Sequence, residues 1–164
     1  MASFENHIEQ VKKNLSFLQQ TNCIKLEFWD WQVTISFYVG VHVVNAHLAY
    51  VGNFHYRTHE HVKHEINPYN SKSDCTIPQD IYLDYVKLEG LSRRSRYLCD
   101  NNSQNKDSNA HFTFDKHFAK SVKCLDRLLN YFDKRYNLGI KNIQIQCIEL
   151  SDKTPLTIFK VVNK

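Results

Sequence analysis

Residues 30–51, DWQVTISFYVGVHVVNAHLAYV, decide the fold of this chain. The stretch is rich in β-branched and aromatic residues, which favour strands. Its apolar side chains nevertheless recur at intervals of three and four residues, which is the period of a helix with one apolar face. These side chains are Val33, Phe37, Val41, Val44, Leu48 and Val51. Because Asp30 suits a first helical turn and Gly52 suits a helix end, we predict one long helix over 30–51.

The same period continues on both sides of this helix. It predicts helices over about 4–20, 55–66 and 78–98, and a long helix that begins near residue 114 and is closed by Gly139. The residues that carry the pattern in the longer helices are Phe4, Ile8, Val11, Leu15 and Leu18, then Ile81, Tyr85, Leu88 and Leu91, and finally Phe114, Phe118, Val122, Leu125, Leu129 and Phe132. Residues 100–109 contain no apolar side chain, so we predict an exposed loop there.

Toward the C-terminus the apolar period changes from that of a helix to that of a strand. Residues 143–147 and 158–162 alternate apolar and polar side chains, and residues 151–155 between them supply turn residues. This pattern predicts a β-hairpin over 141–163, packed on the helices because an isolated hairpin is marginally stable. The predicted fold is therefore mostly α, a single domain over 1–164 built as an antiparallel bundle of about five helices with this small hairpin appended.

Composition agrees with one helical domain. The chain has 164 residues with 42% hydrophobic residues, and its 4 Gly and 3 Pro are too few for a turn-dense β protein. A formal charge of +4 with nine histidines permits a polyanionic partner. Five cysteines, an odd number spaced at least 23 residues apart, suggest neither a disulfide framework nor a zinc motif. The first residues lack a basic start and an apolar stretch, so we expect a cytoplasmic protein with no membrane partner.

The densest chemistry lies in residues 55–64, HYRTHEHVKH, which contain four histidines. On a helix, Arg57, His61 and His64 occupy positions i, i+4 and i+7 and share one face. An Arg that holds a phosphate and a His that transfers protons are enough to cleave RNA without a metal, because the ribose 2′-hydroxyl is the nucleophile. The same histidines are also explained as solvated residues of a short surface helix.

A metal site is a further alternative for this segment. His55 and His59 are separated as i, i+4, and His61 and His64 as i, i+3, and either pair has the spacing of zinc ligands. No cysteine lies nearby, so further ligands would have to come from elsewhere in the chain. We therefore expect neither a metal nor another cofactor.

A basic cluster follows in residues 92–97, SRRSRY. Arg93 and Arg96 share a helix face with Tyr97 beside them, an arrangement suited to phosphate contacts and base stacking. The alternative is an ordinary intrahelical pair between Glu89 and Arg93.

Polar residues also interrupt the apolar helix over 30–51. Tyr38, His42 and Asn45 form a line beside its apolar face, and either belong to a buried hydrogen-bond network or line a cleft. Together with His59, these three are our candidates for cleft-lining residues.

These residues together resemble a known family. The pattern Asp30-Trp31, Phe37-Tyr38, His42, Ala46, Gly52 and Thr58-His59, followed by Tyr85, Leu88 and Ser92-Arg93-x-x-Arg96-Tyr97, is similar to that of bacterial HEPN-like (higher eukaryotes and prokaryotes nucleotide-binding) proteins. The similarity covers about residues 28–98, and the helix after residue 114 would complete the bundle.

The resemblance implies a function on RNA or nucleotides. Many HEPN proteins are metal-independent ribonucleases of toxin–antitoxin or phage-defence systems, and act as homodimers that bring an Arg, four to six residues and a His from each chain to a shared cleft. Arg57 and His64 have this spacing, and Arg93 and Arg96 would then follow the RNA backbone. Other members only bind nucleotides or partners, such as an antitoxin or a nucleotidyltransferase, so a non-catalytic binding or dimerisation module is the alternative.

Overall fold

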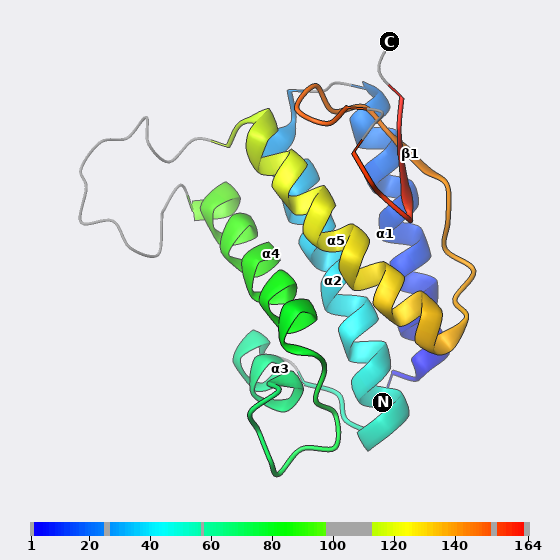
Figure 1. Cartoon of the computed structure of the whole chain (residues 1–164), viewed down its shortest axis with the longest axis vertical. Coiled ribbons are helices and arrows are strands. Elements are labelled where there is room, and N and C mark those ends of the chain that lie inside the picture. Colours follow the sequence, from blue (N-terminus) through cyan, green and yellow to red (C-terminus); the bar gives the residue numbers. More distant parts are fainter. Residues whose placement is uncertain (1, 25–26, 57, 98–112, 152–153, 163–164) are drawn as a thin grey trace, which may run out of the picture.

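The computed structural model describes residues 2–24, 27–56, 58–97, 113–151 and 154–162. Within these residues the protein is mostly helical, with five helices and one short two-stranded sheet (Figure 1). The elements are α1 (Phe4–Ile24), α2 (Trp29–Gly52), α3 (His59–Ile66), α4 (Gln79–Tyr97), α5 (Asp115–Tyr136), β1 (Ile143–Ile145) and β2 (Phe159–Val161).

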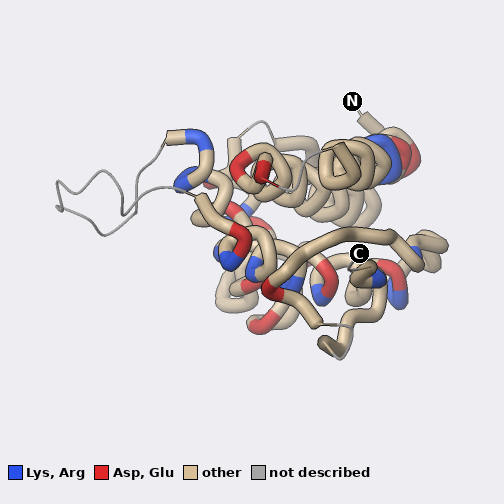
Figure 2. The backbone as a smooth tube through the Cα atoms, turned by 90° about the horizontal axis from the view of Figure 1, so that it is seen from above, with Lys and Arg blue, Asp and Glu red and all other residues tan. Residues whose placement is uncertain are grey.

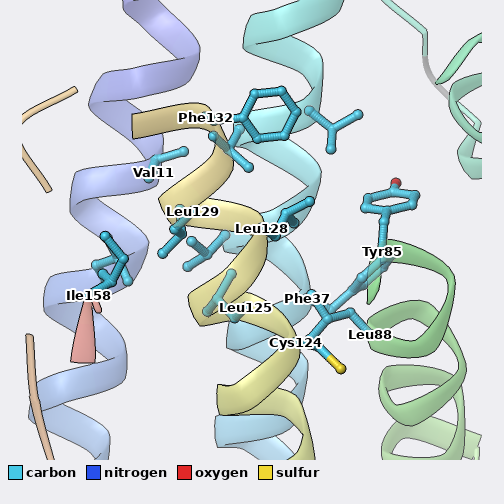
Figure 3. Close-up of a cluster of buried hydrophobic side chains, with 14 of the residues drawn as sticks. Val11, Phe37, Tyr85, Leu88, Cys124, Leu125, Leu128, Leu129, Phe132 and Ile158 are labelled. Carbon is cyan, nitrogen blue, oxygen red and sulfur yellow. The ribbon is translucent and has the colours of Figure 1, made fainter. Parts of the chain in front are cut away.

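Helix α2 is the centre of the domain and confirms the helix predicted over 30–51. α1, α4 and α5 all pack against it, and in Figure 1 α5 lies in front of α2 with α1 and α4 on either side. Its fully buried Phe37 lies in the core beside Tyr85 and Leu88 of α4 and the leucines of α5 (Figure 3). Gly40 lies at a close approach of the helices, because a Cβ atom there would come within 3.2 Å of Leu128. Packing on three sides thus outweighs the strand propensity of the valines.

The apolar character of α2 follows from this central position. By length and composition alone the helix could cross a membrane, but 61% of its most apolar window is buried inside the protein. A helix that is apolar on most sides is expected in the core of a soluble domain. In this helical domain α2 is accordingly the core helix.

The short helix α3 begins later than predicted. The side chain of Thr58 accepts a hydrogen bond from the backbone N–H of His61 at 3.4 Å, which is the geometry of an N-cap. The helix therefore starts at His59, and the prediction that residues 55, 56 and 58 are helical is wrong, whereas residue 57 lies outside the described residues. His55 lies in the segment between α2 and α3, which follows Asn53 in a left-handed conformation with φ of 52°.

The prediction of a β-hairpin is also wrong, because β1 and β2 pair in parallel. Ile143 lies opposite Phe159, and Ile145 lies opposite Val161. A parallel pair needs a connection that returns the chain to its starting end, and residues 146–158 provide it. Alternation of apolar and polar side chains locates both strands correctly but carries no information about their relative direction.

Side chains from the helices hold this C-terminal segment in place. The Asn22 amide of α1 contacts Gln146 twice, accepting from its N–H at 2.6 Å and donating to its carbonyl at 2.8 Å. Asp126 of α5, only 3% exposed, accepts hydrogen bonds from the backbone N–H groups of three consecutive residues, Thr157, Ile158 and Phe159. The segment is thereby fastened to the bundle by hydrogen bonds as well as by apolar contacts.

Candidate functional site

Helix α2 carries a stripe of partly exposed side chains along its surface. The stripe contains Trp31, Tyr38 and His42, which are spaced so that they lie on one face of the helix. Trp31 is 61% exposed and Tyr38 is 39% exposed, whereas His42 is half-buried. Large aromatic side chains exposed in a row on a core helix indicate a surface that meets a ligand or partner.

Two adjoining hollows follow this stripe. The larger, about 340 Å³, lies between α1 and α2 and is lined by Gln10, Asn14, Phe17, Trp31, Thr34, Ile35, Tyr38 and His42. The smaller, about 190 Å³, lies between α2 and α4 and is lined by Asp30, Trp31, Thr34, Ser95 and Arg96. Trp31 and Thr34 belong to both hollows, which are therefore treated as one site, named the α2 groove. Its combined size is that of a small-ligand site.

The α2 groove combines flat aromatic surfaces with one cation. Trp31, Tyr38 and the exposed Phe17 provide rings on the larger side. On the smaller side the Arg96 guanidinium lies 5.2 Å from the centre of the Tyr97 ring, and its Nε donates to the Ser92 carbonyl at 3.4 Å. Aromatic rings beside a guanidinium are the arrangement on which nucleic-acid bases stack while a phosphate is bound.

A chain of three imidazoles ends at the α2 groove. His7 Nδ1 lies 3.2 Å from His42 Nδ1, and His7 Nε2 lies 3.3 Å from His55 Nδ1. A neutral imidazole has one N–H and one lone pair, so His7 donates to one neighbour and accepts from the other. Burial lowers the pKa of His7 to about 4, and the neighbouring His42 and His55 add to this effect. The chain therefore connects a groove-lining histidine to the exposed His55 through a buried neutral one.

His59 lies outside the groove, in a polar cluster with Lys63 and Glu89 near Arg96. Its ring lies 5.0 Å from the Phe37 ring, and Lys63 forms an ion pair of 2.8 Å with Glu89 nearby. Burial lowers the pKa of His59, Glu89 opposes this effect, and Arg96 and Lys63 add to it. Glu89 thus pairs with Lys63 of α3 rather than with Arg93.

The structure does not bring the candidate catalytic histidines to the α2 groove. His61 and His64 are exposed on α3; the His61 ring lies 5.8 Å from Tyr56, and the His64 carbonyl accepts from the Asn70 amide at 3.0 Å. Arg57, their predicted partner, lies outside the described residues. The proposed role of this trio therefore remains a prediction.

The other predicted site residues lie in three different places: in or beside the α2 groove, in the core, and on the surface. Tyr38, His42 and Arg96 line the groove, and Tyr97 lies next to Arg96. Asn45 is buried instead, with its amide donating to the Val41 carbonyl of its own helix at 2.9 Å. Arg93 is exposed on the surface of α4.

A metal site finds no support in the part of the chain that the structure describes, and of the four free cysteines there only Cys23 is exposed. In these residues no three or more His, Cys, Asp or Glu side chains are placed to hold a metal ion. Cys75, Cys124 and Cys147 are buried, and burial raises the pKa of the Cys124 and Cys147 thiols to about 12, far from the reactive thiolate range.

The residues predicted from the sequence omit several members of the site, among them His7 and Trp31. His7 is 4% exposed and lies one position before Ile8 of the apolar face of α1, so its neighbours in sequence give no sign of a histidine partner. Trp31 was noted only as part of a family pattern, although an aromatic residue outside the apolar face of an otherwise buried helix could have identified it.

No family model, curated protein or solved structure matches this chain.

Proposed function

We propose that this chain is a HEPN-like protein that binds single-stranded RNA or a nucleotide in the α2 groove. The observation that carries the proposal is the position of Trp31, whose exposed indole belongs to both hollows. A base stacked on this ring would have Arg96 on one side, to contact a phosphate, and Tyr38 and His42 on the other. We extend the proposal to a cytoplasmic protein that acts as a homodimer or with an antitoxin or nucleotidyltransferase partner.

Replacing Trp31 with alanine is expected to weaken RNA binding by about 5- to 150-fold, because stacking of one base on an aromatic side chain contributes about 1–3 kcal/mol. Because Trp31 is mostly exposed, the variant should fold like the original chain. The measurement is the Kd for a fluorescently labelled oligouridylate, determined by anisotropy.

Two further variants make the Trp31 result specific. Trp31→Phe keeps an aromatic face and should lose much less affinity, whereas Tyr69→Ala removes an even more exposed ring away from the groove and should lose none. An unchanged Kd for Trp31→Ala would remove the basis for placing RNA in the α2 groove.

Metal-independent cleavage of RNA is the second candidate function. The observation that favours it is His42, a groove-lining imidazole whose pKa is lowered by burial and by His55, so that its neutral form can accept a proton from a ribose 2′-hydroxyl. The family resemblance assigns the same chemistry to Arg57, His61 and His64 instead. A non-catalytic binding module needs none of these groups.

Incubation of RNA with the purified protein in EDTA separates these possibilities. Cleavage that leaves 2′,3′-cyclic phosphate ends is expected from an enzyme of this type. Loss of cleavage in His42→Ala but not in His64→Ala would place the chemistry in the α2 groove, and the reverse would place it on α3. RNA that remains intact at high protein concentration would leave only the binding function.

A further inference from the structure

A further hollow, outside the α2 groove, lies between α4 and α5. Its volume is about 360 Å³, and its lining residues are Val86, Lys87, Gly90, Leu91, Arg94, His117 and Lys120. In Figure 1 the two helices run side by side. Arg94 belongs to the C-terminal end of α4 and His117 to the N-terminal end of α5. This site is named the α4–α5 hollow.

Positive charge dominates the α4–α5 hollow. Its lining includes three cationic side chains and no carboxylate. Lys87 and Lys120 form no ion pair with any residue that the structure describes. A further cation, Lys116, lies 5.8 Å from the centre of the Phe114 ring at the start of α5. Lys87 and Lys120 thus place positive charge without an acidic partner in a concave site, which attracts anions.

His117 adds a neutral hydrogen-bond donor to these cations. Its Nδ1 accepts a hydrogen bond from the backbone N–H of Phe114 at 2.9 Å. The proton of the neutral ring is therefore on Nε2, which forms no hydrogen bond within the described parts of the chain. Burial lowers the pKa of His117 to about 4, and Arg94, Lys116 and Lys120 add to this effect. The hollow thus presents hydrogen-bond donors and positive charge, the chemistry that recognises phosphate oxygens.

We propose that the α4–α5 hollow binds a phosphate group of the RNA strand whose bases occupy the α2 groove. The assignment of the phosphate to RNA rests on the function proposed above. Arg96 lines the groove on one side of α4, Arg93 is exposed, and Arg94 lines the hollow. The C-terminal turn of α4 accordingly carries Arg residues in close succession (Figure 2), which gives the backbone of a strand a cationic path from one site to the other.

Binding of the anion itself is tested by NMR of His117 during titration with inorganic phosphate. Bound phosphate offsets the surrounding cations, so the pKa of His117 should rise from about 4 toward its ordinary value of 6.5. The double variant Lys87→Gln/Lys120→Gln should lose this response, while Lys160→Gln on β2 should keep it. A His117 signal that responds to phosphate no more than to chloride at equal ionic strength overturns the site.

The source of the phosphate is tested with oligouridylate and with uridine, which has no phosphate. The double variant should bind oligouridylate more weakly and decrease the slope of log K against log salt concentration by about 1, as expected when one phosphate contact is lost. Its affinity for uridine should not change, because a nucleoside carries no phosphate for the hollow to bind. An unchanged salt slope for oligouridylate overturns the path across α4.

If Trp31→Ala binds RNA normally while phosphate still shifts the pKa of His117, the proposed function fails and the phosphate site stands.

Discussion

Replacing Asp126 with alanine is expected to lower the free energy of unfolding by about 3–5 kcal/mol, because each buried polar group left without a partner costs about 1–3 kcal/mol. The Asp126 carboxylate accepts from the N–H groups of Thr157, Ile158 and Phe159 at 2.8–3.1 Å. Ile158 and Phe159 are buried in the core, so detachment of this segment would also expose apolar surface. Urea denaturation measures the loss, and hydrogen exchange of the three amides shows where the structure opens.

Matched variants separate the role of Asp126 from a general effect of removing charge. Asp126→Asn keeps the size and one acceptor oxygen, so it should lose less stability than the alanine variant. Asp74→Ala removes an exposed carboxylate from a loop and should change the free energy of unfolding by less than about 0.5 kcal/mol. An Asp126→Ala variant as stable as Asp74→Ala, with unchanged exchange of the three amides, would show that these hydrogen bonds do not hold the C-terminal segment.

The helices of this protein are predictable because their signal is local. Each apolar stripe in the sequence reports which face of a helix is buried, and in α2 the period of three and four correctly outweighs the strand propensity of its valines. The late start of α3 also has a local signal, since Thr58 is an N-cap residue type that precedes the helix.

The parallel sheet is not predictable in the same way because its signal is not local. The direction of β2 depends on Asn22, Asp115 and Asp126, three side chains of α1 and α5 that meet backbone groups far away in the sequence. None of them belongs to an apolar period, and each looks like an ordinary polar residue of a helix. The turn residues between the strands therefore favoured a hairpin that the tertiary contacts exclude.

The same difference between local and non-local signals decides which residues of the candidate site could be predicted. Tyr38 and His42 could be identified because they break the apolar pattern of one helix. Their partner His7 lies on α1, 35 residues from His42, and only tertiary packing brings the two rings together. The spacing of Arg57, His61 and His64 assumed a helix through residue 57, whereas α3 begins at His59.

Acidification from pH 6.5 to pH 4 is expected to unfold the protein, because three buried histidines are neutral in the folded state. Burial lowers the pKa of His7, His47 and His117 to about 4 from an ordinary value of 6.5. The unfolded chain therefore binds protons more tightly than the folded protein. The contribution of these histidines to stability is constant above pH 6.5 and decreases as the pH falls. It stops changing below about pH 4, where the histidines are protonated in both states. Each histidine then contributes a loss of at most about 3 kcal/mol. Since a domain has about 5–15 kcal/mol in total, loss of helical circular dichroism should occur within this pH range.

His117→Gln identifies the contribution of one of these histidines. Glutamine at this third helical position can still accept from the Phe114 N–H, so stability near pH 7 should remain similar. Because glutamine does not titrate, the variant should be more stable than the original chain near pH 4, by at most about 3 kcal/mol, in buffer without phosphate. His64→Gln, which removes an exposed histidine, should leave the pH curve unchanged. Parallel curves for His117→Gln and the original chain would mean that His117 gains its proton as easily in the folded protein as in the unfolded chain, and its burial among cations would then have no effect on stability.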